Sequence, residues 1–257
     1  MLIGVGSFMD KISKGVKVKT YENTPSGVDC FVTTRVGGYS SGEFSSMNMA
    51  VYTDDNPMTV IKNIELMRDA YGLSSVTTLL QVHGNIVHEV TAGNRTDVLY
   101  SEGDGLFTTE KDMALGVLTA DCYNLFLAGE KGIAALHCGH KSVSADIMSK
   151  GVELFEKHGD FPVYAGIGPG ISAENYEVGR ELADKFAEIC PESVKEINGK
   201  LCLCIRTVIE ENLLAKGIDN IEHLKACSFE NESLYSYRRD NGKTGRMVGV
   251  IVRRNLV

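Results

Sequence analysis

The longest apolar stretches of the chain lie near its middle and predict strands that are covered on both faces. Residues 115–127 are almost continuously apolar apart from Thr119-Ala120-Asp121-Cys122, and a second apolar run covers residues 133–136. Glu130-Lys131-Gly132 between the two runs predicts a turn, so we expect a buried β-hairpin. Burial of a charged aspartate and a thiol inside such a strand costs free energy, so their presence suggests a function and makes this hairpin a candidate site.

Apolar residues at helical spacing mark the helices. Val60, Ile64 and Met67 predict a helix that ends at Gly72, and similar spacing predicts helices over 145–158, 182–189 and 205–213. Shorter apolar segments predict strands at 28–35, 77–81, 86–90, 106–108, 163–167, 221–226 and 247–253. Strands outnumber helices, so we expect one α+β domain with mixed sheets over residues 1–257, with a variable N-terminal segment over residues 1–25.

The charge and cysteine content narrow the class of protein. The net charge is −8 and no block of Lys and Arg stands out, which argues against a nucleic-acid partner. No apolar run reaches the roughly 20 residues of a membrane helix, and the apolar start lacks the features of a signal peptide. Seven cysteines, an odd number, suit a reducing compartment, so we expect a cytoplasmic protein with free thiols.

Four side chains offer a metal site. His83, Cys122, His137 and His140 combine a thiolate with imidazoles, a set that suits zinc or copper, and three protein ligands would leave a coordination position open for water or substrate. The same residues also allow a Cys-His nucleophile pair, oriented by Asp121 or by an amide. The sequence alone leaves both interpretations open.

A glycine-rich segment, residues 36–42, follows the predicted strand at 28–35. Its glycines permit positive φ angles and the close approach of a ligand, and Arg35 beside them could hold an anion with its guanidinium fork.

Taken together, these pieces resemble the laccase-domain family, also called the YfiH-like or multicopper polyphenol oxidase family, whose members are now regarded as purine nucleoside phosphorylases. The pieces occur in the family's order from about residue 28 to the end. They are Thr33-Thr34-Arg35-Val36-Gly37-Gly38-Tyr39-Ser40, Met47-Asn48-Met49, Gln81-Val82-His83-Gly84, Gly103-Asp104-Gly105-Leu106, Thr119-Ala120-Asp121-Cys122, Ala135-Leu136-His137, Gly168-Pro169-Gly170-Ile171, Tyr176-Glu177-Val178-Gly179, Tyr237-Arg238-Arg239 and Thr244-Gly245-Arg246-Met247.

The resemblance implies an α/β/β/α layered fold and a zinc ion, or copper, held by His83, Cys122 and His137. It implies phosphorolysis of adenosine, inosine, guanosine and methylthioadenosine, together with deamination of adenosine, so the partners are a purine nucleoside and phosphate. These three ligands and Asp121 are then the catalytic residues. The expected substrate- and phosphate-binding residues are Arg35, Asn48 and Lys141.

The chain departs from the family where a substrate would bind. His140 and Lys141 stand where the family usually has Trp and Arg, Asn175 replaces a common cysteine, and Cys204 replaces an aspartate. His140 and Cys138 could add ligands and favour copper. Three alternatives therefore stay open: a copper-dependent polyphenol oxidase, a Cys-His hydrolase of a cell-wall precursor, and a non-catalytic binder of a nucleoside or a protein.

Overall fold

Two six-stranded sheets pack face to face in the computed structural model, which describes residues 9–255. The first sheet has the order β1 (Met9–Ser13), β2 (Val16–Thr20), β3 (Val28–Thr33), β14 (Met247–Arg253), β7 (Ala114–Thr119), β4 (Val76–Thr77). The second has the order β13 (Ile221–His223), β10 (Tyr164–Ile167), β8 (Tyr123–Ala128), β9 (Ile133–Cys138), β6 (Gly105–Thr108), β5 (Val87–Glu89). Both sheets contain parallel and antiparallel pairs.

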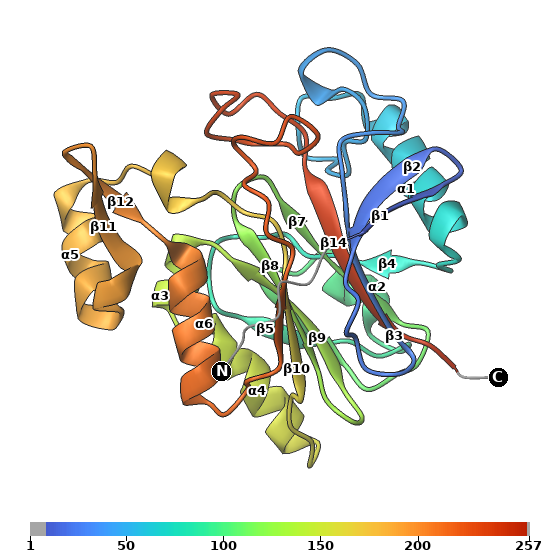
Figure 1. Ribbon diagram of the computed structural model, residues 1–257. Helices are drawn as coiled ribbons and strands as arrows, with labels where there is room; N and C mark the ends of the chain where they lie inside the picture. The colour runs from blue at the N-terminus through green and yellow to red at the C-terminus, as the bar shows by residue number, and fades with distance from the viewer. Residues whose placement is uncertain (1–8, 256–257) are drawn as a thin grey trace.

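Helices cover the outer faces of the two sheets (Figure 1). The helix α1 (Pro57–Tyr71) packs on the first sheet, and α3 (His140–Ser144), α4 (Ile147–Lys157) and α6 (Ile205–Ala215) pack on the second. The short α2 (Arg95–Val98) precedes β6, and α5 (Arg180–Ile189) lies beside a small hairpin of β11 (Val194–Ile197) and β12 (Lys200–Leu203). Three 3-10 turns complete the described elements: Gly42–Phe44, Ala173–Asn175 and Pro191–Ser193.

Three apolar cores fill the three spaces between these layers. One lies between α1 and the first sheet, one between the two sheets, and one between the second sheet and α3, α4 and α6. This arrangement is the α/β/β/α sandwich that the resemblance implied, so the predicted α+β class is confirmed.

The central strands are continuously apolar because each of their faces meets a different core. In β8, Leu125 and Leu127 point toward the helices, whereas Phe126 points toward the facing sheet. In β7, Val117 faces the second sheet and Leu118 faces α1. Because such a strand is buried on both faces, its sequence does not alternate between apolar and polar residues.

The predicted central hairpin is only partly correct. Strands β8 and β9 do pair as an antiparallel hairpin, with Tyr123 opposite Cys138. However, β7 belongs to the other sheet, so the apolar run over 115–127 is two strands that the segment 120–122 connects from sheet to sheet. Asp121 makes this crossing with a φ of 96°, a value that side-chain-bearing residues adopt rarely.

The predicted helices agree with the structure. The Asn56 side chain accepts hydrogen bonds from the backbone N–H groups of Met58 and Thr59, at 2.9 and 3.3 Å, and so caps the start of α1. Gly72 ends this helix in the left-handed conformation, with a φ of 61°. No helix among the described residues is long and apolar enough to cross a membrane.

Two hairpins and the role of the glycine-rich segment were not anticipated. The pair β1–β2 extends the first sheet, and β11–β12 forms a separate two-stranded sheet. Gly37 has a φ of 109°, and the backbone of Gly15 occupies the space that a side chain at this position would need. Gly37 therefore allows close packing of the chain against itself, whereas Gly42 has open space around its Cβ position.

Candidate metal centre and cavity

Three of the predicted ligands meet at one end of the sandwich. His83 comes from the loop between β4 and β5, Cys122 from the segment that joins β7 to β8, and His137 from the end of β9. Their ligand atoms all lie within 4.8 Å of one another. Cys122 is half-buried and His137 is buried, whereas His83 is exposed, so the group is open to solvent on one side.

Asp104 organises this group. Its buried carboxylate accepts hydrogen bonds from the backbone N–H groups of Val82, His83 and Gly84, and from Nδ1 of His137 at 2.8 Å. One carboxylate thus fixes the loop that presents one histidine and the ring of the other. Since an ionised carboxylate only accepts, His137 carries a proton on Nδ1 and keeps Nε2 for a ligand.

The electrostatics favour a thiolate. Burial opposes the ionisation of Cys122, but the charge and hydrogen bond of His137, together with a hydrogen bond from His83, lower the pKa of Cys122 to about 6. Burial also opposes the charged form of His137, but Cys122 and Asp104 raise the pKa of His137 to about 9. Burial of Asp104 is outweighed by the hydrogen bonds from His137 and Gly84, and the pKa of Asp104 is lowered.

Gly139 leaves room for two of the three ligand side chains, Cys122 and His83. A Cβ atom at this position would lie 3.0 Å from Sγ of Cys122 and 3.0 Å from Nδ1 of His83. Such contacts are too short, so a side chain here would displace the ligands.

The group lies in the wall of a cavity of about 510 Å³. This is the size range of a small-molecule site. Its lining combines the metal group with aromatic rings, two arginines and one carboxylate. The lining residues are Tyr52, Gln81, His83, Leu118, Thr119, Ala120, Asp121, Cys122, Tyr123, His137, Cys138, Gly139, His140, Ile171, Tyr176, Ile205, Tyr237, Arg238 and Arg246.

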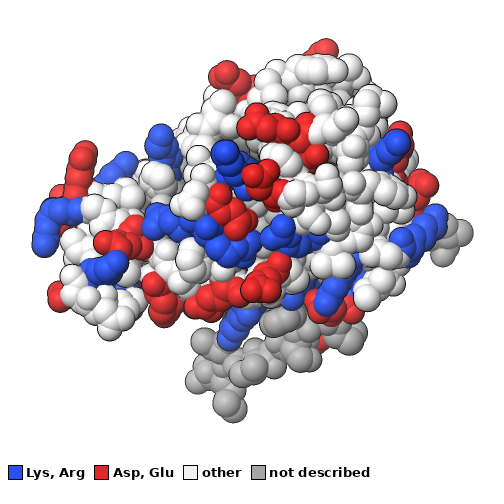
Figure 2. Space-filling model, turned by 90° about the horizontal axis from the view of Figure 1, so that it is seen from above, with Lys and Arg blue, Asp and Glu red and all other residues white. Residues whose placement is uncertain are grey.

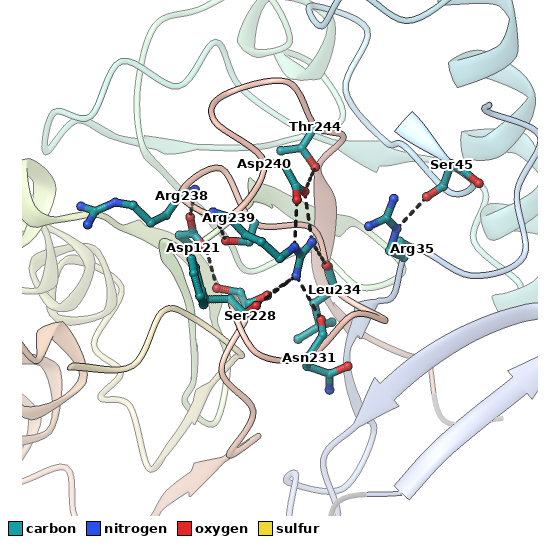
Figure 3. A network of polar contacts seen from close by, with 12 residues as sticks. Arg35, Ser45, Asp121, Ser228, Asn231, Leu234, Arg238, Arg239, Asp240 and Thr244 are labelled. Atoms are coloured by element: carbon teal, nitrogen blue, oxygen red, sulfur yellow. Dashed lines mark hydrogen bonds and ion pairs between the residues drawn. The ribbon is translucent and has the colours of Figure 1, made fainter. Parts of the chain in front are cut away.

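Asp121 lines this cavity, but both of its carboxylate oxygens already bind the protein. Ser228 Oγ donates to Oδ1 at 2.6 Å, and the backbone N–H of Arg238 donates to Oδ2 at 2.7 Å (Figure 3). The orienting group of His137, expected to be Asp121 or an amide, is Asp104 instead. The catalytic role of Asp121 stays a prediction.

The three residues predicted to bind substrate or phosphate do not line the cavity. Nε of Arg35 donates to the Ser45 carbonyl at 2.7 Å. Asn48 is fully buried, where its side-chain oxygen accepts from the backbone N–H groups of Ala50 and Arg246. Lys141 is exposed on α3. Their roles in binding stay predictions, which the placement does not support.

His140 and Cys138 line the cavity but lie outside the group of three ligands among the described residues. Nδ1 of His140 lies 3.1 Å from the hydroxyl oxygen of Tyr176. Burial raises the pKa of Cys138 far above its usual range, so this thiol stays protonated. Neither side chain is placed as a fourth ligand.

Sequence reasoning missed the role of Asp104 and the place of Arg238 and Arg246 in the cavity wall. All three lie in motifs that were noticed only as parts of the resemblance. Nothing local distinguishes them, because their roles depend on which loops meet at the cavity. An aspartate between two glycines and an arginine in a polar loop read equally well as turn residues.

Comparisons with known proteins show similarity over most of the chain. A family model described as multi-copper polyphenol oxidoreductase laccase matches residues 29–254. A Deinococcus radiodurans protein named purine nucleoside phosphorylase is 37% identical over 227 residues, which cover 85% of this chain and 87% of that protein. A Corynebacterium glutamicum protein, also named purine nucleoside phosphorylase, is 33% identical over 226 residues, covering 85% of this chain and 92% of its own. The crystal structure of YlmD from Geobacillus stearothermophilus superposes with a TM-score of 0.86 at 26% identity, covering 96% of this chain and 99% of that one.

Proposed function

Because this chain belongs to the multi-copper polyphenol oxidoreductase laccase family, whose curated relatives are named purine nucleoside phosphorylases, we propose that it is a metal-dependent purine nucleoside phosphorylase. The observation that supports the proposal most is the meeting of His83, Cys122 and His137 in the wall of a cavity of about 510 Å³. Adenosine, inosine, guanosine and methylthioadenosine are the proposed nucleosides. The proposal includes a cytoplasmic location, which the odd number of cysteines supports.

The donor set fits a single metal ion. One thiolate and two imidazoles are typical zinc ligands, and Gly139 leaves space beside them. Asp104 supplies the carboxylate that commonly orients a ligating histidine. A zinc ion held there would act as a Lewis acid and keep a position open for water or substrate.

Phosphorolysis breaks the bond between C1′ of the ribose and N9 of the purine, joins a phosphate oxygen to C1′, and leaves the purine with one proton. The cavity lining supports two parts of this exchange, the binding of the base and the binding of the anion. Tyr52, Tyr176 and Tyr237 offer aromatic surface for a base, and two arginines offer donors for an anion. We keep Asp121 in the proposal as a positioning residue, which acts through the loop that it holds.

We also propose that the site deaminates adenosine, in which water adds to a purine carbon and ammonia leaves. Three protein ligands leave a coordination position that suits this reaction as well as phosphorolysis. Conversion of adenosine to inosine without phosphate, and its loss in His83→Ala, is the expected result.

The copper-dependent polyphenol oxidase fits less well. Reduction of oxygen by a laccase uses several copper ions, and the described residues offer one group of three donors. Metal analysis of the purified protein distinguishes the two: we expect close to one zinc per chain and no oxygen uptake with a phenol.

A Cys-His hydrolase is the second candidate, and one observation favours it. Cys122, His137 and Asp104 follow one another like a nucleophile, a base and an orienting carboxylate, and the pKa of Cys122 is lowered to about 6. His83 argues for the metal, because a second imidazole beside the thiolate has no role in such a triad. A hydrolase of this kind would keep its activity in a chelator, whereas the proposed phosphorylase would lose it.

The deciding experiment is incubation of the purified, metal-analysed protein with inosine, with and without phosphate, while hypoxanthine release is followed. We expect release that depends on phosphate and is abolished in His83→Ala and in Cys122→Ala. His88→Ala is the matched control, since this histidine lies on β5 and bonds the Glu102 carbonyl at 2.9 Å, away from the cavity lining.

No release of hypoxanthine or adenine from the folded, zinc-loaded protein would refute the proposal. If Cys122→Ala still releases hypoxanthine, the group of three ligands takes no part in the reaction.

A further inference from the structure

Two arginines in the cavity wall, Arg238 and Arg246, are not paired with an acidic side chain in the part of the chain that the structure describes. Nη1 of Arg238 donates to the Glu177 carbonyl at 3.2 Å, and Nη1 of Arg246 donates to the carbonyls of Thr244 and Gly245 at 2.9 and 3.0 Å. Within residues 9–255, neither guanidinium forms an ion pair with a carboxylate. Each therefore brings a positive charge to the cavity and keeps further N–H groups free for a ligand.

Aromatic rings hold both guanidinium groups in place. Cζ of Arg238 lies 5.1 Å from the centre of the Tyr176 ring, and Cζ of Arg246 lies 5.5 Å from the centre of the Tyr237 ring. A guanidinium that rests on a ring face is attracted by the ring and loses less freedom when it binds. All four residues line the same cavity.

The neighbouring arginines are arranged differently. Arg239 forms a bidentate ion pair with Asp240, at 2.8 and 3.0 Å, and donates to four backbone carbonyls of the surrounding loop. Arg35 does not line the cavity and donates to Ser45. Figure 3 shows the Arg239 guanidinium enclosed by its partners, whereas the Arg238 side chain extends away from them.

The single carboxylate in the lining does not neutralise Arg238. Asp121 binds the backbone N–H of Arg238 and the hydroxyl of Ser228, so it positions the arginine loop while the guanidinium points elsewhere. The molecule as a whole has a net charge of −8, and the face seen in Figure 2 mixes acidic with basic side chains. Attraction of an anion therefore comes from local charge in the cavity wall, to which these two arginines contribute beside the proposed metal ion.

We propose that Arg238 and Arg246 form the binding site for the phosphate co-substrate. This inference rests on the proposed phosphorylase function, and it assigns the phosphate to residues other than Arg35. Guanidinium groups match the oxygen geometry of phosphate, and hydrogen bonds between charged groups are the strong ones. Tyr176 and Tyr237 orient the two side chains, and Asp121 is a positioning residue for Arg238.

The test measures binding of inorganic phosphate to the metal-loaded protein by calorimetry, so it does not require activity. Loss of one charged hydrogen-bond donor costs at least about tenfold in affinity, so Arg238→Gln and Arg246→Gln should each raise the Kd for phosphate by that factor or more. Arg238→Lys keeps the charge but lacks the two-pronged guanidinium, so its Kd for phosphate should lie between those of the unchanged protein and Arg238→Gln. Arg180→Gln is the control, because the Arg180 side chain is 77% exposed on α5 and its guanidinium lies 4.0 Å from the exposed Asp184 carboxylate. Thermal melting and metal content verify that each variant is folded and loaded.

Kinetics give a second readout. The two glutamine variants should raise the KM for phosphate at least about tenfold while the KM for inosine stays close to that of the unchanged protein.

Three results would overturn the assignment. They are wild-type phosphate affinity in both glutamine variants, loss of phosphate binding in Arg35→Gln instead, or binding of inosine 5′-monophosphate without binding of inorganic phosphate. If phosphate binds through these arginines but no nucleoside is cleaved, the anion site stands and the proposed function fails. If nucleosides are cleaved and the variants behave normally, the function stands and the assignment fails.

Discussion

Replacement of Asp104 by Asn should weaken the metal centre without touching a ligand. The Asp104 carboxylate accepts four hydrogen bonds, two on each oxygen: His83 N–H and His137 Nδ1 on Oδ1, and Val82 and Gly84 N–H on Oδ2. An amide has one acceptor oxygen, so two of the four donors would face an NH₂ group. A buried donor without a partner costs about 1–3 kcal/mol, which predicts a loss of stability of about 2–6 kcal/mol.

The effect on metal binding follows from the same geometry. If the NH₂ group faces His137, the imidazole loses the acceptor that keeps its proton on Nδ1. If it faces the loop, His83 loses its fixed position. Substitution of such a supporting residue typically costs 10–100-fold in metal affinity, or about 1.4–2.8 kcal/mol. The affinity is measured by competition with a chromophoric chelator, and the stability by urea unfolding of the metal-free protein.

Asp160→Asn is the matched control. This carboxylate also accepts four backbone hydrogen bonds, from Glu130, Lys131, Gly132 and Phe161 at 2.8–3.0 Å, but it lies at the β8–β9 turn, outside the cavity lining. It should lower the free energy of unfolding and leave zinc affinity unchanged. Wild-type zinc affinity in Asp104→Asn, or an equal loss in Asp160→Asn, would refute the reasoning.

Further variants and conditions test the same centre. Gly139→Ala should lower metal affinity at least about tenfold, because its Cβ would lie 3.0 Å from the Cys122 sulfur. Gly179→Ala, with open space around its Cβ, should leave the affinity unchanged, and equal metal affinities of the two variants would contradict this reasoning. Between about pH 6 and about pH 9 metal binding must release the His137 proton, so the logarithm of the metal-binding constant should rise by about one per pH unit. The rise should be steeper below about pH 6, where Cys122 is protonated too, and should level off above about pH 9. A flat profile in a competition titration would contradict the pKa shifts. Asn48→Ala should lower the free energy of unfolding by about 2–4 kcal/mol in urea, since its buried amide joins two loops, and an unchanged value would argue for a binding role instead.

The layered fold could be predicted where burial leaves a periodic signal. The helices α1, α4 and α6 were found because each buries one stripe of apolar residues and ends near a glycine or a polar cap. The division of the central apolar run between two sheets could not be found. Thr119 and Ala120 are buried like the strands around them, and the turn at Asp121 uses a positive φ without the glycine that would mark it.

Candidate ligands of the metal centre could be picked out by residue type, because thiolate and imidazole are typical zinc ligands. Residue type also included His140, and only the resemblance narrowed the set to His83, Cys122 and His137. Their supporting residues could not be predicted. Asp104 is 33 positions from the histidine that it orients, and its contact exists only because β6 and β9 pair side by side. Residue type suggests a ligand, but only the sheet register shows what orients it.

The arginines show the limit of motif reasoning most clearly. Arg238 and Arg239 are neighbours in one motif, and both carry the same charge. Asp240 neutralises Arg239, and the loop carbonyls take up its donors, whereas Asp121 binds only the backbone of Arg238 and leaves its guanidinium on the Tyr176 ring. A substitution at either position would reduce activity, but for different reasons. Loss of Arg239 should unfold the loop and impair every step, whereas loss of Arg238 should raise the KM for phosphate alone, so the two kinetic signatures separate a structural arginine from a binding one.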